Sequence, residues 1–330
     1  MKKTVYIFTD GELKRKDNTI CLETSNGKKY LPVENVAEIL VFGEVTVNKR
    51  FLEFLTQSEI ILHFFNRYGY YVGSFYPREH LNSGYMILKQ AEFYLDRDKR
   101  FVLAKKFVWG AIENIKKVLT YYQNRGKNLE EIIDKVNSIS DGLVRCRNVD
   151  ELMAIEGNVR EQYYHAFDRI LNKEHFVFEA RSKRPPKNRL NALISFGNSL
   201  LYTVCLSEIY RTHLDPRIGF LHTTNFRRFS LNLDVAEIFK PIIVDRVIFN
   251  LVNKSIIKSQ HFESKLDGIV LNEKGKQVFI KEFDEKLKTT LYHKRLKRKI
   301  SYRSLIRLEL YKIEKHLMGD EEYKPFISEW

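Results

Sequence analysis

The sequence is organised around the stretch IGFLHTTNFRRFSLNLDVAEIFKPIIVDR, residues 218–246. At about 100° per residue its second half has the periodicity of a helix. The apolar stripe of that helix consists of Leu231, Val235, Ile238 and Ile242. Asp234 and Glu237 lie three residues apart, which places both carboxylates on one face, about 60° apart. The two acids therefore flank the buried stripe instead of facing away from it.

A histidine, His222, precedes these two carboxylates in the same stretch. Imidazole and carboxylate groups are ligands for Mn²⁺ or Mg²⁺, and a metal site of that kind at a phosphodiester supports nuclease or strand-transfer chemistry. The same residue types are often helix caps, ion pairs or surface groups. The stretch thus indicates a metal site without assigning one.

The composition points to a polyanionic partner. The chain has 330 residues, 44% of them hydrophobic, which is enough for two domains and a sizeable core. Its formal net charge is +14, and it contains 23 Phe and 18 Tyr. A basic, aromatic-rich chain favours nucleic acid over an anionic membrane as partner, although a generally basic proteome would give a similar charge.

The sequence gives no sign of a membrane, secretory or zinc protein. It has no run of 18 or more apolar residues, and its basic N-terminus lacks the apolar core of a signal peptide. Cys21, Cys146 and Cys205 are far apart and form no CxxC pair. This spacing argues against zinc sites and a disulfide framework, and we expect a cytoplasmic protein.

Residues 1–84 predict a small β-domain. Short apolar runs are separated by turn signals, including a hairpin signal at Ser25-Asn26-Gly27-Lys28. Gly43 interrupts one run, which indicates a bulge, a turn between strands or a close backbone approach. KRFLEFLTQSE predicts one short helix, and two further strands close the domain. His63 lies in an apolar run, where a buried and hydrogen-bonded histidine is the favoured interpretation.

Residues 85–330 predict a mostly α-helical domain, so the fold class is α+β. Asn148, followed by Glu151, and Asn188 are the expected N-caps of two long helices. Pro241 predicts a kink or a new helix start. Two further segments carry predictions: a β-hairpin over 266–283 with its turn at Asn272–Gly275, and a strongly basic helix pair over 286–319.

Glu156 extends the set of acids that could bind a metal. It lies in Glu156-Gly157-Asn158-Val159-Arg160, in a predicted helix. A glycine inside a helix costs about 1 kcal/mol relative to alanine, so Gly157 suggests close approach of another helix or of substrate. Arg160 is one turn beyond Glu156, where an ion pair between the two is the simplest role.

Four blocks of sequence together resemble the CRISPR-associated integrase family, the endonuclease-like proteins that capture new spacers. The blocks are EGNVR at 156–160, RPPKNRLNAL at 184–193, LDPRIGFLH at 214–222, and SLNLDVAEIFKP at 230–241 with VDR at 244–246. They occur in the family's order and spacing, and the resemblance covers essentially the whole chain. Lys240 stands where relatives often carry arginine.

The resemblance implies an N-terminal β-domain that dimerises, residues 1–84, and a helical catalytic domain, residues 85–330. It implies Mg²⁺ or Mn²⁺ held by Glu156, His222 and Glu237, with Asp234 as a possible alternative ligand. It also implies an asymmetric homodimer, a small CRISPR-associated adaptation protein that bridges two dimers, and double-stranded DNA substrates, namely the prespacer and the CRISPR repeat. Asn191 matches a family asparagine expected near the site, although it could equally be a polar group that stabilises its helix.

The family grips the backbone of duplex DNA, so basic residues are the candidates for phosphate contacts. They are Arg160, Arg227, Arg228, Lys294, Arg295, Lys297, Arg298 and Lys299. A solvated helix face is the alternative for the run at 294–299.

The expected reaction joins a DNA 3′-hydroxyl to a phosphodiester with the help of a divalent cation. Exchange of one phosphodiester for another needs no ATP, in keeping with a sequence that has no Walker motif. Without the cation the neighbouring carboxylates repel one another, so one of them is expected to have a perturbed pKa. Two other functions remain open at this point: a non-catalytic basic DNA-binding scaffold, and a general repair nuclease for branched DNA that uses the same site.

Overall fold

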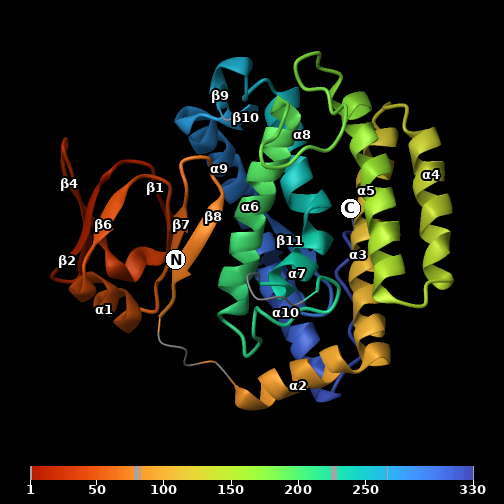
Figure 1. Ribbon diagram of the computed structural model, residues 1–330, viewed down its shortest axis with the longest axis horizontal. Helices are drawn as coiled ribbons and strands as arrows, with labels where there is room; N and C mark the ends of the chain where they lie inside the picture. The colour runs from red at the N-terminus through yellow and green to blue at the C-terminus, as the bar shows by residue number, and fades with distance from the viewer. Residues whose placement is uncertain (1, 78–80, 82, 224–228, 266, 330) are drawn as a thin grey trace. The chain divides into compact units, whose positions relative to one another are not determined.

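The computed structural model describes residues 2–77, 81, 83–223, 229–265 and 267–329. The chain forms two compact units, Met1–His80 and Leu81–Trp330. The first unit is built mainly of strands and the second mainly of helices (Figure 1). The α+β prediction is therefore confirmed.

The first unit contains two four-stranded sheets. In one sheet the order is β1 (Lys3–Ile7), β5 (Val36–Val41), β7 (Ile61–Phe65) and β8 (Tyr71–Phe75), with only β8 antiparallel to its neighbour. In the other the order is β4 (Gly27–Pro32), β3 (Thr19–Thr24), β2 (Gly11–Lys16) and β6 (Val45–Val47). The predicted short helix is α1 (Lys49–Gln57), which buries Phe51, Phe54 and Leu55 in the core of this unit.

Local signals in the first unit act as the sequence predicts. β3 and β4 form the predicted hairpin, and Gly27 in it has a φ of +120°. Gly43 lies between strands of different sheets, where a Cβ would come within 2.7 Å of the carbonyl oxygen of Phe8. His63 is buried, and its Nδ1 hydrogen-bonds to the hydroxyl of Ser74 at 2.6 Å.

The helices of the second unit pack against one another. They are α2 (Gly84–Leu95), α3 (Arg97–Gln123), α4 (Glu130–Ser140), α5 (Val149–Leu171), α6 (Arg189–Ile209), α7 (Leu231–Phe239), α8 (Arg246–Asn253), α9 (Glu273–Lys288) and α10 (Tyr302–Met318). Figure 1 shows α3, α4 and α5 side by side, and α3 also packs against α7. One helix of the described residues, α6, is long and apolar enough to cross a membrane, and 83% of that stretch is buried inside the unit.

The helix boundaries confirm several predictions. The side chain of Asn148 accepts a hydrogen bond from the amide of Glu151 at the start of α5, and Asn188 caps α6 in the same way. Pro241 begins a π-helical turn, η3 (Pro241–Asp245), between α7 and α8. This is a local break in the helix of the kind that the proline predicts.

Two predictions for the last third of the chain are wrong. The hairpin there is β9 (Phe262–Lys265) with β10 (Gly268–Leu271), and Asn272 does not lie in its turn. Its side chain accepts a hydrogen bond from the amide of Gly275, so Asn272 is the N-cap of α9. The sequence Asn-Glu-Lys-Gly fits both a turn and a capped helix start, and only the tertiary structure distinguishes them.

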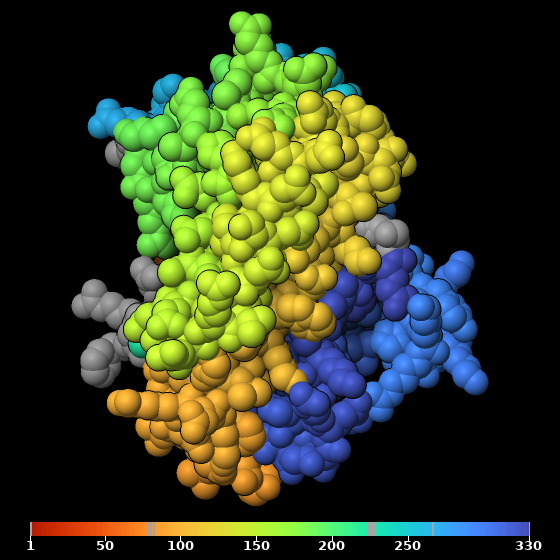
Figure 2. Space-filling model, turned by 90° about the vertical axis from the view of Figure 1, so that its right-hand side faces the viewer, coloured from red at the N-terminus to blue at the C-terminus, as the bar shows by residue number. Residues whose placement is uncertain are grey.

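The predicted basic helix pair is also incorrect, because the stretch between the end of α9 and the start of α10 is not helical. Residues before α10 form a hairpin of β11 (Thr290–His293) and β12 (Arg298–Ser301). Lysines and arginines spaced four apart in this run would repel one another on a helix, whereas a hairpin spreads them around a turn. Figure 2 shows the hairpin as a blue lobe that stands out at the surface beside α10.

Two helical glycines provide a test of the packing. A Cβ at Gly197 would lie 2.6 Å from Cγ1 of Val244 and 2.8 Å from a ring carbon of Phe279, so Gly197 lets η3 and α9 approach α6. We expect Gly197→Ala to lower the free energy of unfolding by about 1–3 kcal/mol. A Cβ at Gly157 would meet no described atom within 4 Å. Gly157→Ala should therefore raise the free energy of unfolding by about 0.5–1 kcal/mol.

Urea unfolding of both variants measures these effects. A Gly197→Ala protein as stable as the unsubstituted one would contradict the packing of α6. The open space at Gly157 also answers one of the sequence-based alternatives: among the described residues no neighbouring helix explains this glycine.

Candidate functional site

Arg160 joins the two acids that the sequence places far apart. Its Nη2 donates a hydrogen bond to Oε2 of Glu237 at 2.7 Å, and its Nε donates to Oε1 of Glu156 at 3.4 Å. Glu156 and Arg160 lie one turn apart on α5, and Glu237 comes from α7. Arg160 and Glu237 are 8% and 4% exposed, so this cluster is almost closed to solvent.

A second cation binds the same carboxylate. Nζ of Lys240, one turn beyond Glu237, donates a hydrogen bond to Oε1 of Glu237. The ammonium group also lies 5.0 Å from the ring centroid of Tyr202 on α6, and Lys240 is only 7% exposed. Each carboxylate oxygen of Glu237 thus has its own cationic partner.

Asp234 hydrogen-bonds to both the backbone and the ring of His222. Asp234 is fully buried on α7, and it accepts hydrogen bonds from the backbone amides of Phe220, Leu221 and His222. Its Oδ1 also lies 2.8 Å from Nδ1 of His222. A carboxylate at Nδ1 fixes the orientation of the imidazole and leaves Nε2 as the free ring nitrogen, as in the carboxylate–histidine pairs of metal sites.

The surrounding charges shift the pKa values of the two glutamates in opposite directions. Burial raises the pKa of Glu156, and the negative charge of Glu237 raises it further, against the opposing effect of Arg160. Burial also disfavours ionised Glu237, but the charges of Lys240 and Arg160 outweigh it and lower that pKa. A perturbed carboxyl pKa of this kind is what the sequence argument expects of two neighbouring acids.

The pKa of His222 depends on two opposing effects. Burial lowers it, but the hydrogen bond and negative charge of Asp234 raise it by more, and Glu237 adds to the rise. The imidazole therefore senses both carboxylates of α7. His222, Asp234 and Glu237 form one electrostatic unit, although they come from a loop and from two positions on a helix.

The donor set fits a hard divalent cation. Glu156 and Glu237 offer carboxylate oxygens and His222 offers Nε2, a combination suited to Mn²⁺ or Mg²⁺. Asp234 already accepts four hydrogen bonds, which suits a supporting role better than direct ligation. Within the described part of the chain no three His, Cys, Asp or Glu side chains form a ready-made metal cage, and Arg160 and Lys240 contact the acids instead.

Asn191 fixes the loop that precedes α6. Its Oδ1 accepts hydrogen bonds from Nη1 of Arg181 and from the amide of Ser182, and its Nδ2 donates to the carbonyl of Ala180. Asn191 is fully buried. Asn191 thus holds a basic segment in place. This role combines the two alternatives from the sequence, a residue near the site and a polar group that stabilises its helix.

That segment contains two basic residues that the sequence argument missed. Burial lowers the pKa of Lys183, and the positive charges of Arg181 and Lys240 lower it further, while Glu237 and Glu156 act in the opposite direction. Within the described residues, Arg181 donates to neutral acceptors on Ser182, Asn191 and Ser195. The run Ala-Arg-Ser-Lys-Arg before a capped helix was the available signal.

The other predicted DNA contacts fall into two groups. Arg227 and Arg228 lie outside the described residues. The residues from Lys294 to Lys299 lie in and beside the turn of the β11–β12 hairpin, where Lys294 pairs with Glu329 at 2.7 Å and Arg295 with Glu321 at 2.6 Å. Their contact with DNA stays a prediction, as does that of Arg160, whose guanidinium is already engaged by two carboxylates.

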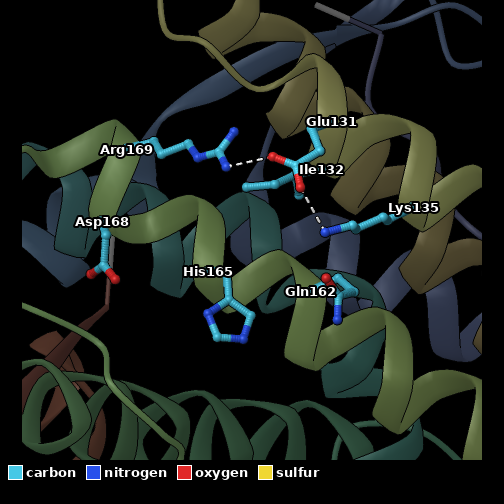
Figure 3. Close-up of a pocket in the computed structure, with 7 residues that line it drawn as sticks. All are labelled: Glu131, Ile132, Lys135, Gln162, His165, Asp168 and Arg169. Atoms are coloured by element: carbon cyan, nitrogen blue, oxygen red, sulfur yellow. Dashed lines mark hydrogen bonds and ion pairs between the residues drawn. The ribbon is translucent and has the colours of Figure 1, made fainter.

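A separate hollow of about 460 Å³ lies between α4 and α5. Figure 3 shows it lined by Gln162, His165, Asp168 and Arg169 of α5, with Glu131 bridging Arg169 and Lys135. Arg169 is nine residues beyond Arg160, which is about half a turn around the helix. The hollow is therefore on the opposite face of α5 from Arg160 and does not belong to the acid cluster.

Comparison with known proteins places this chain in a family. The family model described as CRISPR associated protein Cas1 matches residues 5–285. A protein from Thermodesulfovibrio yellowstonii, CRISPR-associated endonuclease Cas1 2, is 72% identical over 330 residues, all of both chains.

Solved structures share the fold. The structure of a Cas1 protein from Thermotoga maritima matches with a TM-score of 0.88 and 52% identity, covering 99% of this chain and all of that one. A casposase bound to integration product matches with a TM-score of 0.87 at 19% identity, over 99% of this chain and 94% of that one. The last likeness concerns the fold alone. On the family match and these identities, the chain belongs to the CRISPR-associated protein Cas1 family.

Proposed function

We propose that the protein is a divalent-metal-dependent DNA integrase and endonuclease that inserts new spacers into a CRISPR array. The observation that carries the proposal is the shared grip of Arg160 on Glu156 and Glu237, which brings two carboxylates from distant parts of the sequence to one buried cluster. His222, held by Asp234, supplies the third donor.

In this proposal three side chains bind the metal ion and a fourth orients one of them. A bound Mg²⁺ or Mn²⁺ would orient the attacking DNA 3′-hydroxyl and stabilise the charge that develops on the phosphoryl and leaving oxygens. Glu156, Glu237 and Nε2 of His222 would hold that ion, and Asp234 would keep the imidazole in place. Glu237 and Asp234 are buried, and the low polarity of their surroundings strengthens their electrostatic interactions.

The basic surface near the site would bind the substrates. Arg181, which hydrogen-bonds to Asn191, and Lys183, which is close enough to the carboxylates to sense their charge, would contact DNA phosphates. Double-stranded prespacer and repeat DNA would be the substrates. A relative named Cas1 endonuclease supports action on DNA, and the casposase with its integration product has the same fold.

The assembly proposed here follows the family. Residues 1–84 would dimerise, and a small CRISPR-associated adaptation protein would bridge two dimers. A solved complex of Cas6-RT-Cas1 with Cas2 contains a chain whose fold matches this one with a TM-score of 0.86, at 16% identity, over 100% of this chain and 36% of that one. That likeness supports the fold of the unit that such an assembly would use.

A chelator experiment separates catalysis from mere binding. With Mn²⁺, purified protein should join a duplex with a free 3′-hydroxyl into CRISPR repeat DNA, and excess EDTA should remove the joined product because the carboxylates lose their shared cation. Duplex binding at fixed salt should change less than threefold (about 0.6 kcal/mol), because phosphate contacts by lysine and arginine need no metal.

Gel-resolved joining and fluorescence anisotropy measure the two quantities. A non-catalytic DNA-binding scaffold would bind duplex without joining or cutting it in any metal. A general repair nuclease would cut Holliday junctions in preference to repeat DNA. Either result would overturn the proposal.

A further inference from the structure

We propose that Lys240 and Arg160 take the place of the metal ion before it binds, and that they set the metal affinity of the site by competing with it. The inference rests on the proposed function, since it concerns the same three ligands. It assigns to Lys240 and Arg160 the part of positioning residues that keep the carboxylates assembled in the metal-free protein.

The contacts show that the cations occupy the metal-binding atoms themselves. Nζ of Lys240 binds Oε1 of Glu237, Nη2 of Arg160 binds Oε2 at 2.7 Å, and Nε of Arg160 reaches Glu156 at 3.4 Å. A metal ion ligated by Glu156 and Glu237 would bind the same carboxylate groups. The incoming ion therefore competes with Lys240 and Arg160 for the negative charge of these carboxylates.

Charge balance leads to the same conclusion. Two carboxylates and two cations sum to zero in a cluster whose central members are less than 10% exposed. A divalent ion added without movement would leave an excess of two positive charges in a buried site, which is strongly unfavourable. The added charge is compensated if Lys240 or Arg160 moves away from the carboxylates, or if an anion binds. The phosphodiester of bound DNA is such an anion.

The surroundings of Lys240 suit a side chain that can move. Its ammonium group lies 5.0 Å from the centroid of Tyr202, so a cation–π contact gives it a second partner besides Glu237. A displaced Lys240 can stay on the tyrosine ring and face a phosphate. One Nη atom of Arg160, Nη1, is buried without a hydrogen-bond partner among the described residues, so this guanidinium has a donor left for an anion.

The chain offers a matched control lysine. Lys286 on α9 also lies over a tyrosine ring, 4.1 Å from the centroid of Tyr302, and its side chain is partly buried. The charge that acts on it is that of Arg246, not that of Glu156 or Glu237. Lys286→Met therefore removes a lysine of similar environment without touching the carboxylates.

Calorimetric titration of metal-free protein with Mn²⁺ alone tests the proposal. Lys240→Met and Lys240→Gln remove the competing charge, so each should bind Mn²⁺ about tenfold more tightly than the unsubstituted protein (about 1.4 kcal/mol). Their melting temperatures without metal should fall by about 5 °C or more, because Glu237 loses a buried partner. Lys240→Arg and Lys286→Met should bind Mn²⁺ within about threefold of the unsubstituted protein (about 0.6 kcal/mol).

Weaker or unchanged Mn²⁺ binding by the neutral Lys240 variants would contradict the proposal. If Lys240 only supports the fold, its neutral variants bind Mn²⁺ more weakly or equally, and the proposal is overturned. If both neutral variants are unfolded without metal, saturating Mn²⁺ must refold them, and failure to refold also overturns it. If the unsubstituted protein binds no Mn²⁺, the proposed function is overturned as well. If it binds Mn²⁺ and the neutral Lys240 variants bind with the same affinity, only the proposed competition is overturned.

Discussion

Replacement of Glu156 or His222 by alanine is expected to reduce strand joining at least about a hundredfold while the protein stays folded. Each substitution deletes one of three proposed metal donors. Neither deletes a cap or a core side chain, since Glu156 and His222 are both partly exposed. The joining assay with Mn²⁺ measures the effect, and circular dichroism checks the fold.

Two exposed neighbours serve as controls. Glu161 lies on α5 close to Glu156 in sequence, and His165 faces the hollow between α4 and α5. Glu161→Ala and His165→Ala should join DNA within about threefold of the unsubstituted protein, because surface changes of this kind alter energies by about 0.5 kcal/mol at most. Joining at the unsubstituted level by both Glu156→Ala and His222→Ala would eliminate the site as assigned.

The second large effect is expected from Asp234→Asn. Asp234 is fully buried and accepts hydrogen bonds from three backbone amides and from His222. An amide group can accept with only one of its two terminal atoms, so some of these donors would lose their partner. We expect a loss of about 3 kcal/mol in the free energy of unfolding, and about 10–100-fold weaker Mn²⁺ binding because His222 is no longer held.

Urea unfolding and calorimetry measure the two losses separately. Asp134→Asn is the matched control, since Asp134 is an exposed carboxylate on α4, and the change should shift stability by less than about 0.5 kcal/mol. If Asp234→Asn unfolds like the unsubstituted protein but no longer binds Mn²⁺, Asp234 would be a direct ligand, contrary to its position here.

The local features of the candidate site could be predicted from the sequence because they depend on short spacings. The three-residue interval between Asp234 and Glu237 and the caps at Asn148 and Asn188 each involve residues within one helical turn. Interactions at that range are fixed by helix geometry. The family resemblance then linked Glu156 to the same site, which spacing alone could not do.

The rest depended on contacts between distant segments. The sequence leaves open whether Asp234 ligates a metal, because it does not show the hydrogen bonds from the amides of Phe220 and Leu221, which reach Asp234 only through the fold. Arg160 is a candidate phosphate contact from the sequence, and only the fold shows that its guanidinium also donates a hydrogen bond to Glu237 on another helix. The sequence pattern did not predict the β11–β12 hairpin. Its two strands are only four residues long and pair across a turn, and the basic run between them shows no clear alternation of apolar and polar residues.

The most direct test of the account is a crystal of the protein soaked in Mn²⁺ and measured for anomalous scattering. We expect one strong peak about 2.0–2.3 Å from a carboxylate oxygen of Glu156, one of Glu237 and Nε2 of His222, with Asp234 still on Nδ1 of the imidazole. A peak bound elsewhere, or the absence of any peak between these three side chains at saturating Mn²⁺, would contradict the claim that they form one metal site.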